Sequence, residues 1–404
     1  MIENACRSCG TPDLKTIVSL GKTPLANALL TKEQLGQPEE LFPLDVVYCS
    51  ACTLVQITCT VPPEKLFREY LYFSSFSDTV IANAAAITDR LIETRHLDAH
   101  HRVVEIASND GYLLKHYQRR GVGVLGIEPA VNIARVAQEQ GIETLGEFFD
   151  EALGQRLRDS ADVFHANNVL AHVADLNGVV AGLRWLLKPE GIAVIETPYV
   201  KDLIDRVEFD TIYHEHLCYY SLTALTNLFN RHHLTVIDVE RLPIHGGSLR
   251  VFVQHEGMPV EDRVPQLLAE ESAWGVHDFA FYRDFGERIE TLKRDVVTFL
   301  AHLKQHGKRI AVYGASAKGS TLLNCFGIGA ETLDFVVDRS TVKQGLYTPG
   351  TRLPIYPPAK LLETMPDYVL LLSWNFADEV LAQQAEYRQR GGQFILPIPE
   401  VRVV

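Results

Sequence analysis

The sequence predicts an α/β protein of three domains, and three observations support this fold class. The chain has 404 residues, which suits two to three domains at roughly 150 residues each. Its first 67 residues hold two Cys-x-x-Cys pairs and show little helical periodicity. After residue 102, short apolar runs alternate with amphipathic stretches in two blocks. Because this alternation is typical of parallel sheets covered by helices, both blocks are expected to be Rossmann-like.

The expected domains span residues 1–70, 71–258 and 259–404. In the second domain, strands are expected at 103–106, 123–127, 161–166, 191–196, 234–239 and 248–254, and helices at 112–120, 132–140, 176–187 and 222–231. A short connection joins the last two strands and predicts an antiparallel pair. In the third domain, a helical stretch over 264–305 precedes strands at 309–314, 333–338, 368–373 and 393–398 and a helix at 319–326.

The composition excludes several classes of protein. A hydrophobic content of 47% suffices for several cores and argues against disorder. The net charge of -13 argues against a nucleic-acid partner, since phosphate binding needs a basic surface. No run approaches ~20 apolar residues, so no membrane span is expected. Residues 1–10 lack the basic start and apolar core of a secretory signal, so the expected compartment is the cytoplasm.

Four of the seven cysteines form two close pairs that predict a metal site. Cys6 and Cys9 make the first pair, and Cys49 and Cys52 make the second. Each pair places two sulfurs on one tight turn, and four thiolates complete the closed tetrahedral site of structural Zn²⁺. A redox Cys-x-x-Cys is the alternative, but it lacks the βαβ context that such a motif needs. With no open coordination position, the zinc is expected to stabilise the small domain rather than to catalyse.

The turn after the first central strand predicts a cofactor site. Residues 103–111 pass from a strand into a helix without the glycines that a phosphate-binding loop usually has. Glu105 and Asp110 disfavour a pyrophosphate and favour a cationic ligand. Glu128 follows the next strand, where an acidic residue typically binds ribose hydroxyls. These features suit S-adenosylmethionine. Candidate cofactor-binding residues are Glu105, Ala107, Ser108, Asn109, Asp110, Gly111, Glu128, Pro129, Asn167 and Asn168.

A series of motifs along the whole chain then resembles a known family. The cysteine pairs are followed by Tyr72-Phe-Ser-Ser-Phe-Ser77, the 105–111 turn, Tyr213-His-Glu-His216, His245-Gly-Gly-Ser248 and Gly314-Ala-Ser-Ala-Lys-Gly319. This series resembles the sugar C-methyltransferases of deoxysugar pathways. The resemblance implies a zinc-binding domain, a class I methyltransferase domain and a C-terminal Rossmann-like domain. It further implies methylation at C-3 of a nucleotide-linked 4-keto-deoxysugar, often a dTDP sugar, in a cleft between the domains.

The same resemblance, together with the chemistry, nominates the catalytic residues. The family's motif falls on Tyr213, Glu215 and His216, and His172 and His232 match further active-site positions. A carbon next to a ketone must lose a proton before it can be methylated, so a base and an oxyanion donor are needed. We expect His216 to be the base and Glu215 to orient it or to bind a sugar hydroxyl. His172 and His232 are rival bases, and a zinc site at His214 and His216 is an alternative.

The substrate is expected to lie between the domains. Candidate substrate-binding residues are Tyr72, Ser74, His245, Gly246, Gly247, Lys318, Asn324, Arg339 and Tyr347. The turn at residues 245–248 would offer a backbone surface to the sugar or its diphosphate. Lys318, at the start of a helix, would bind the diphosphate. Asp338 stands 24 residues after Gly314, the distance of a ribose-binding acid, so a nicotinamide site is the alternative for the C-terminal domain.

The function expected from the sequence is therefore S-adenosylmethionine-dependent C-methylation of a nucleotide-linked keto-deoxysugar through an enolate, by a monomer. Three other functions remain open at this point. One is an O- or N-methyltransferase acting on a related nucleotide sugar. Another is a NAD-dependent oxidoreductase that uses the C-terminal domain. The third is a binding module without turnover.

Overall fold

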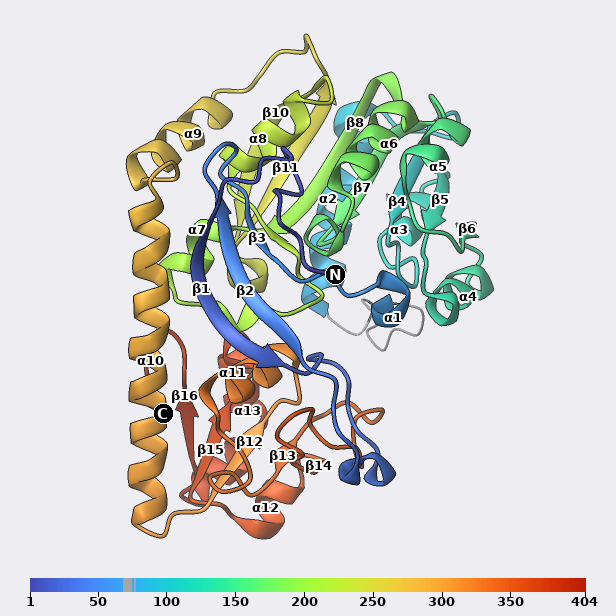
Figure 1. Ribbon diagram of the computed structural model, residues 1–404. Coiled ribbons are helices and arrows are strands. Elements are labelled where there is room, and N and C mark those ends of the chain that lie inside the picture. The colour runs from blue at the N-terminus through green and yellow to red at the C-terminus, as the bar shows by residue number, and fades with distance from the viewer. Residues whose placement is uncertain (68–74, 76–77) are drawn as a thin grey trace.

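The computed structural model describes the chain except residues 68–74 and 76–77, and it contains three β-sheets (Figure 1). The N-terminal sheet is antiparallel, in the order β1-β2-β3-β9. Its strands are β1 (Leu14–Thr23), β2 (Phe42–Cys49), β3 (Val55–Ile57) and β9 (Cys218–Tyr219). The last strand comes from the second predicted domain, so the N-terminal sheet is completed from far along the chain. The domain boundaries at residues 70 and 258 stay predictions.

The central sheet has the order β10-β11-β8-β7-β4-β5-β6. Its strands are β4 (Arg102–Ile106), β5 (Gly123–Ile127), β6 (Thr144–Leu145), β7 (Ala161–Asn167), β8 (Leu187–Pro198), β10 (Leu234–Leu242) and β11 (Ser248–His255). β11 runs antiparallel to both of its neighbours, which confirms the expected antiparallel pair. The strands from β8 to β6 are parallel. Their carboxyl ends therefore meet at one edge of the sheet, where α/β proteins bind ligands.

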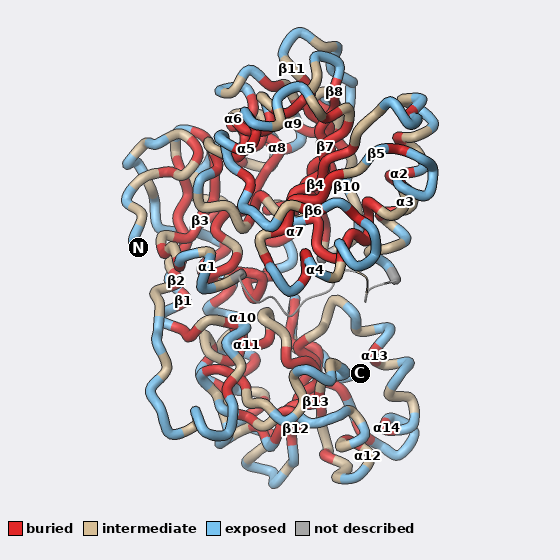
Figure 2. The backbone as a smooth tube through the Cα atoms, turned by 90° about the vertical axis from the view of Figure 1, so that its right-hand side faces the viewer, coloured by how far each residue is buried: buried red, intermediate tan, exposed pale blue. Residues whose placement is uncertain are grey.

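Helices cover both faces of this sheet because its strands are apolar on both sides. Val104 faces one cluster of buried side chains together with α5 and α6, whereas the adjacent Val103 faces a second cluster with α2 and α3. Figure 2 shows these strands as buried tube beneath more exposed helices and loops. The helices are α2 (Asp78–Arg95), α3 (Leu114–Arg119), α4 (Val131–Glu139), α5 (Glu151–Arg156), α6 (Leu176–Leu186), α7 (Val200–Asp205) and α8 (Leu222–Asn230).

The C-terminal sheet has the order β14-β13-β12-β15-β16-β17 and is parallel except at β17. Its strands are β12 (Ile310–Tyr313), β13 (Val336–Val337), β14 (Ile355–Tyr356), β15 (Tyr368–Leu371), β16 (Gln393–Leu396) and β17 (Arg402–Val403). Its helices are α11 (Ala317–Phe326), α12 (Lys360–Thr364), α13 (Ala377–Gln383) and α14 (Ala385–Gln389). Both α/β blocks predicted from the sequence are thus present.

The stretch expected to be helical over 264–305 is two helices, α9 (Arg263–Trp274) and α10 (Phe279–Gln305). Gly275 ends α9 at a φ of +98°, a conformation that glycine adopts without strain, and the Asp278 side chain caps α10. α10 runs beside both the N-terminal sheet and the C-terminal domain (Figure 1). Its Tyr282 stacks on Tyr48 of β2 at 4.4 Å between ring centroids. In the described part of the chain, no helix combines the length and apolar composition needed to cross a bilayer.

A long connection between β1 and β2, residues 24–41, leaves the N-terminal sheet and reaches the C-terminal domain (Figure 1). We call it the arm. Leu30 of the arm forms an antiparallel bridge with Tyr347, with both N–H···O distances at 2.9 Å. Beyond it, the Arg352 guanidinium donates to the carbonyl oxygens of Leu35 and Gln37 at 2.6 and 2.9 Å. The first and third domains are therefore joined directly.

Candidate active site

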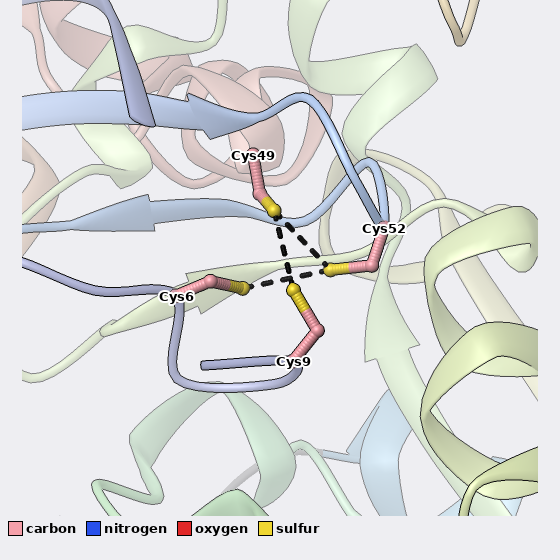
Figure 3. A group of neighbouring side chains, drawn as sticks. All are labelled: Cys6, Cys9, Cys49 and Cys52. Carbon is pink, nitrogen blue, oxygen red and sulfur yellow. Dashed lines mark hydrogen bonds between the residues drawn. The ribbon is translucent and has the colours of Figure 1, made fainter. Parts of the chain in front are cut away.

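The four paired cysteines converge at one end of the N-terminal sheet (Figure 3). Their sulfurs lie within 4.8 Å of one another, with Cys6 and Cys52 3.5 Å apart and Cys9 and Cys49 also 3.5 Å apart. Zn–S bonds of about 2.3 Å in a tetrahedron place sulfurs about 3.8 Å apart. The cluster therefore fits Zn²⁺, and the first domain is a zinc-binding domain.

The backbone turns explain why each cysteine pair folds this way. Gly10 donates to the carbonyl oxygen of Cys6 at 2.8 Å, and Thr53 donates to that of Cys49 at 2.9 Å. Both residues have a positive φ, +74° and +64° respectively, so each turn closes directly after its second cysteine. The zinc ion would occupy the fourfold thiolate site without an open position, which is the arrangement of a structural metal.

The cofactor candidates lie at the carboxyl edge of β4, β5 and β7, as predicted for neighbouring parallel strands. Glu128 accepts the backbone N–H groups of Asn109 and Ala130 at 2.9 and 2.8 Å, so its carboxylate holds the 107–111 loop against β5. Ala107 and Asn109 have φ values of +47° and +50°. This strained loop delays the next helix, which begins at Leu114 rather than at the predicted residue 112.

Several buried acceptor atoms at this edge lack a hydrogen-bond partner among the described residues. They are Glu105 Oε2, Asp110 Oδ1, Asn167 Oδ1 and Asn168 Oδ1. Burial, together with the nearby Glu128, Asp110 and Glu196, raises the pKa of Glu105 well above its ordinary value. Buried acceptors without donors are costly, and they become favourable when a ligand supplies donors or positive charge. S-adenosylmethionine supplies hydrogen-bond donors through its amino group and hydroxyls, and positive charge through its sulfonium and amino group. These acceptor atoms therefore fit this cofactor.

The catalytic candidates form a cluster on the segment after η4 (Phe209–Thr211). The Tyr213 hydroxyl lies 3.0 Å from His216 Nε2, and His216 Nδ1 lies 2.8 Å from the carbonyl oxygen of Thr211. Since a carbonyl oxygen only accepts, Nδ1 carries the hydrogen, and Nε2 holds the lone pair of the neutral ring. His172 of η3 (Leu170–His172) meets the His216 ring edge-on, with centroids 4.8 Å apart.

Two further contacts place this cluster beside the cofactor edge. Leu217 donates its N–H to the carbonyl oxygen of Ala171, and the Tyr220 hydroxyl donates to that of Leu170. Both acceptors belong to η3, which begins two residues after Asn168. Desolvation lowers the pKa of His172 to about 4, so this ring is neutral at pH 7.

Glu215 does not orient His216, which corrects one of our expectations. Residues 213–216 form a tight turn, closed by the His216 N–H that donates to the carbonyl oxygen of Tyr213 at 2.8 Å, and Glu215 instead accepts from Asn27 Nδ2 at 2.6 Å. The Thr211 carbonyl takes the orienting role. Burial raises the pKa of Glu215 to about 7, with Asn27 opposing the rise. Glu215 as a ligand for a sugar hydroxyl stays a prediction.

The two other histidine hypotheses are not supported. His214 Nε2 lies 3.1 Å from the carbonyl oxygen of Pro43, so His214 and His216 do not share a metal. Among described residues, the cysteine cluster is the one group of three or more potential ligands that could hold an ion. His232 lies beside the zinc knuckle, where its Nε2 contacts Asn177 Oδ1 at 2.9 Å. Asn177 in turn donates to the carbonyl oxygen of Arg7, so this histidine is structural.

The turn at residues 245–248 also has a packing explanation. A Cβ on Gly246 would lie 2.3 Å from the Glu208 carboxylate, and one on Gly247 would lie 2.3 Å from the Asp202 carboxylate. Both positions have a positive φ. Two carboxylates therefore approach these glycines, but Arg206 and Arg241 lie beside the same carboxylates, and Gly246 and Gly247 as substrate ligands stay a prediction. The side chain of His245, like Tyr72 and Ser74, lies outside what the structure describes.

Lys318 lies beside the buried acidic residues Glu208 and Asp210, where the third domain meets the catalytic segment. The Trp374 indole donates to Asp210 Oδ2 at 2.7 Å, and Lys318 Nζ lies 4.7 Å from the centroid of the Trp374 ring. Burial raises the pKa of Glu208 to about 8, and the Lys318 charge opposes this rise. Lys318 Nζ is buried without a hydrogen-bond partner among the described residues, and Lys318 as a ligand for the diphosphate stays a prediction. Asp210 directly precedes Thr211, so the C-terminal domain supports the carbonyl that holds His216.

The remaining C-terminal candidates have structural partners. Asn324 Nδ2 donates to the carbonyl oxygens of Ser320 and Pro349. Arg339 pairs with the exposed Glu379 at 3.1 Å, and the backbone of Tyr347 holds the arm. These contacts give Asn324, Arg339 and Tyr347 roles that need no substrate.

The alternative of a nicotinamide site is not supported by the turn after β12, which is largely filled by side chains of the protein. Asp338 accepts the Ala315 N–H at 2.8 Å, inside the glycine turn itself. Ala26 and Leu29 of the arm line the same turn, where a cavity of about 10 Å³ remains. A single water molecule needs roughly that much room. The cavity between the arm and the turn after β12 therefore has no space for a dinucleotide while the arm is in place.

The structure adds three groups that the sequence analysis missed: Asn27, the Thr211 carbonyl and Asp210. Asn27 is far from the other site residues in sequence and belongs to no motif, so nothing local could have indicated it. A carbonyl group carries no sequence signal either. Asp210 stands three residues before Tyr213, and an acidic residue so close to a catalytic motif was a signal that could have been used.

Comparison with known proteins agrees with this organisation. Three family models match the chain: "Putative zinc binding domain" over residues 6–67, "Methyltransferase domain" over 77–239 and "C-methyltransferase C-terminal domain" over 243–399. The C-methyltransferase NovU of Streptomyces niveus is 38% identical over 407 residues, which cover 99% of this chain and 96% of NovU. A ubiquinone biosynthesis O-methyltransferase of Rhodopseudomonas palustris (strain TIE-1) is 29% identical over 24% of this chain and 39% of its own length.

Solved structures give weaker likenesses. The PH0226 protein of Pyrococcus horikoshii OT3 is 14% identical, covering 49% of this chain and 100% of its own, with a TM-score of 0.39. The 1,6-didemethyltoxoflavin-N1-methyltransferase of Burkholderia thailandensis is 18% identical, covering 43% and 77%, with a TM-score of 0.33. The family follows from NovU and the three family models rather than from these structures. The chain belongs to the C-methyltransferase family that includes NovU, and it is an S-adenosylmethionine-dependent C-methyltransferase.

Proposed function

We propose that the chain methylates a carbon next to the ketone of a nucleotide-linked 4-keto-deoxysugar, at C-3, through an enolate. The observation that carries this proposal is the Tyr213–His216 pair. A histidine whose Nδ1–H is fixed by a carbonyl oxygen presents Nε2 as a base, and a phenol hydroxyl rests on that same atom. Methylation of an oxygen or nitrogen needs no such proton removal from carbon. The motif series quoted above supports the sugar as substrate.

In the proposed mechanism, His216 Nε2 takes the proton from the carbon next to the ketone. The electron pair of that C–H bond forms the C=C bond of the enolate, and the π pair of the carbonyl moves onto the ketone oxygen. The Tyr213 hydroxyl, which lies on His216 Nε2 in the free protein, would turn from Nε2 to the ketone oxygen and donate a hydrogen bond to the oxyanion as it forms. Desolvation lowers the pKa of His172 to about 4, so its ring is a weak base and would not take this proton instead. Glu215 would accept a sugar hydroxyl. S-adenosylmethionine, when bound, supplies an electrophilic methyl group to the carbon nucleophile.

Glu105, Asp110, Asn167 and Asn168 would hold the cofactor through acceptor atoms that are otherwise unpaired among the described residues. The zinc site would act only on the fold, because all four thiolates are needed to complete its coordination. We also propose the division into domains at 1–70, 71–258 and 259–404.

The experiment that tests this function is mass spectrometry after incubation with S-adenosylmethionine and a panel of nucleotide 4-keto-6-deoxysugars. We expect one sugar to gain a methyl group with an equal amount of S-adenosylhomocysteine. NMR of the product would place the methyl on carbon. In ²H₂O without cofactor, the same sugar should exchange the proton next to its ketone. A methyl on oxygen, or turnover without such exchange in any panel member, would refute the enolate mechanism.

A further inference from the structure

We propose that the C-terminal Rossmann-like turn is a socket for the arm and that the socketed arm delivers Asn27 as a positioning residue for Glu215. This inference rests on the proposed function, because it assigns Asn27 to the same site. It adds a residue from the zinc-binding domain and gives the third domain a role that needs no ligand of its own.

The first step is the contact at the active site. Asn27 Nδ2 donates to Glu215 Oε1 at 2.6 Å. Glu215 is 5% exposed, and Asn27 is the one described side chain whose hydrogen bond favours its ionised form. The titratable neighbours on the packed elements are His172, Tyr213, His214 and His216. Burial keeps the pKa of His172 and of His214 below the ordinary value, so neither ring supplies a compensating charge at pH 7.

The second step is the socket that fixes Asn27. Ala26 and Leu29 flank it in the arm and lie against Gly314, Gly319 and other residues of the turn after β12. A Cβ on Gly314 would lie 2.2 Å from Ser373 Oγ, and one on Gly319 would lie 2.7 Å from Leu372 Cδ1. The glycines therefore serve close packing within the domain. With a cavity of about 10 Å³ remaining, the two apolar arm residues fill the place where a Rossmann domain would bind a nucleotide.

The third step is the clamp that holds the arm in the socket. Leu30 and Tyr347 exchange two backbone hydrogen bonds, and the Arg352 guanidinium binds the carbonyl oxygens of Leu35 and Gln37. Glu39 also accepts the Gly350 N–H at 2.8 Å. These hydrogen bonds hold residues 30–39, on the C-terminal side of Asn27, and Ala26 lies against the turn on its other side. An amide held in this way needs little reordering to keep its bond to Glu215.

The test compares Asn27→Ala and Asn27→Asp with Lys32→Ala, an exposed arm residue, as the matched control. Removing the donor raises the pKa of Glu215 further, so the ionised fraction at pH 7 falls. Because a rise of about one unit from a pKa of about 7 lowers the ionised fraction of Glu215 at pH 7 from about one half to about one tenth, we expect kcat to drop about fivefold for Asn27→Ala. The ascending limb of the pH profile should move up by about one unit, and activity should recover at high pH. Asn27→Asp adds a like charge and should shift the limb further. Lys32→Ala should match the unmodified chain.

Arg352→Ala tests the socket. Loosening the clamp should lower kcat about threefold and speed amide exchange in the arm, and the same change in an Asn27→Ala background should add no further loss in kcat. An equal loss in both backgrounds would overturn the socket. An Asn27→Ala enzyme with an unmoved pH limb would overturn the positioning role, whether its activity is normal or lost with its thermal stability.

A readout without turnover separates this inference from the proposed function. Infrared difference spectra between pH 5 and pH 9, with Glu215→Gln identifying the band, report the protonation of Glu215 directly. A higher midpoint in Asn27→Ala than in the unmodified chain supports the inference even if no panel sugar is methylated. Equal midpoints would refute it even if the sugar reaction is found.

Discussion

The central and C-terminal α/β domains both pass from a first strand through a tight turn into a helix, yet the two turns face opposite conditions. After β4, buried acceptor atoms of Glu105 and Asp110 lack partners among the described residues. After β12, Asp338 is bonded to the turn itself, and Ala26 and Leu29 fill the space above it. The difference indicates that the acidic residue of a Rossmann-like turn predicts a ligand only when its carboxylate remains unpaired.

We expect the largest effect on turnover in the central domain, where His216 lies. His216→Gln keeps a polar side chain but removes the base, so turnover should fall by about 10² to 10⁴. S-adenosylmethionine affinity should stay within about twofold, since His216 is not one of the cofactor residues. A discontinuous assay of turnover and calorimetry of S-adenosylmethionine binding, on the same preparation, check the two expectations. Loss of cofactor affinity in this variant would contradict the separation of the two roles.

A smaller effect is expected at the open turn. Asp110→Asn removes a negative charge near the proposed cationic ligand, and the Kd for S-adenosylmethionine should rise about tenfold to a hundredfold. A cation also favours ionised Glu105, whose pKa is raised in the free protein. The bound pKa is therefore lower, binding releases protons, and affinity should increase as the pH rises above the ordinary value of about 4.5. Calorimetry in buffers of different ionisation enthalpy measures this release; proton uptake would contradict it.

The bond from the C-terminal domain to the catalytic segment should have a moderate effect. Trp374→Phe removes the indole N–H that donates to Asp210, next to the carbonyl that holds His216. We expect kcat to fall about fivefold to tenfold, with the KM for S-adenosylmethionine unchanged. Trp185→Phe is the control, because the Trp185 indole donates to the exposed Glu151 instead. Equal kcat values for both variants would show that the contact has no catalytic consequence.

The smallest effect should come from the filled turn. Asp338→Asn should change the Kd for S-adenosylmethionine by less than about twofold, and NAD should show no saturable binding before or after the change. Asp338 lies in the other α/β domain and serves the turn, so its cost should appear in thermal stability, at about 1 kcal/mol for one lost hydrogen bond. If NAD bound saturably and Asp338→Asn abolished that binding, the conclusion that only the turn after β4 binds a ligand would be wrong.

The fold was largely predictable because apolar periodicity and cysteine spacing are local signals. The alternation after residue 102 predicted both parallel sheets, and the cysteine spacing predicted the zinc-binding domain. The candidate site was predictable only where residues share a motif, as at Tyr213, His216 and the turn after β4. Asn27 joins Glu215 across 188 positions, a tertiary contact without local pattern. The side-chain directions that separate Glu215 from His216 likewise depend on the tight turn at residues 213–216, which the motif itself does not indicate.

The composite N-terminal sheet has a consequence for how the chain folds during synthesis. β3 pairs with β9, with Val55 opposite Tyr219, so the outer edge of β3 stays uncovered until β9 has been synthesised. A nascent chain that has released only the cysteine-bearing segment would present that unpaired edge to other chains. Zinc capture could occur early, but completion of the sheet would follow emergence of the catalytic segment from the ribosome. The same stretch that carries Tyr213 and His216 would thus act late in folding, as the strand that closes the first domain.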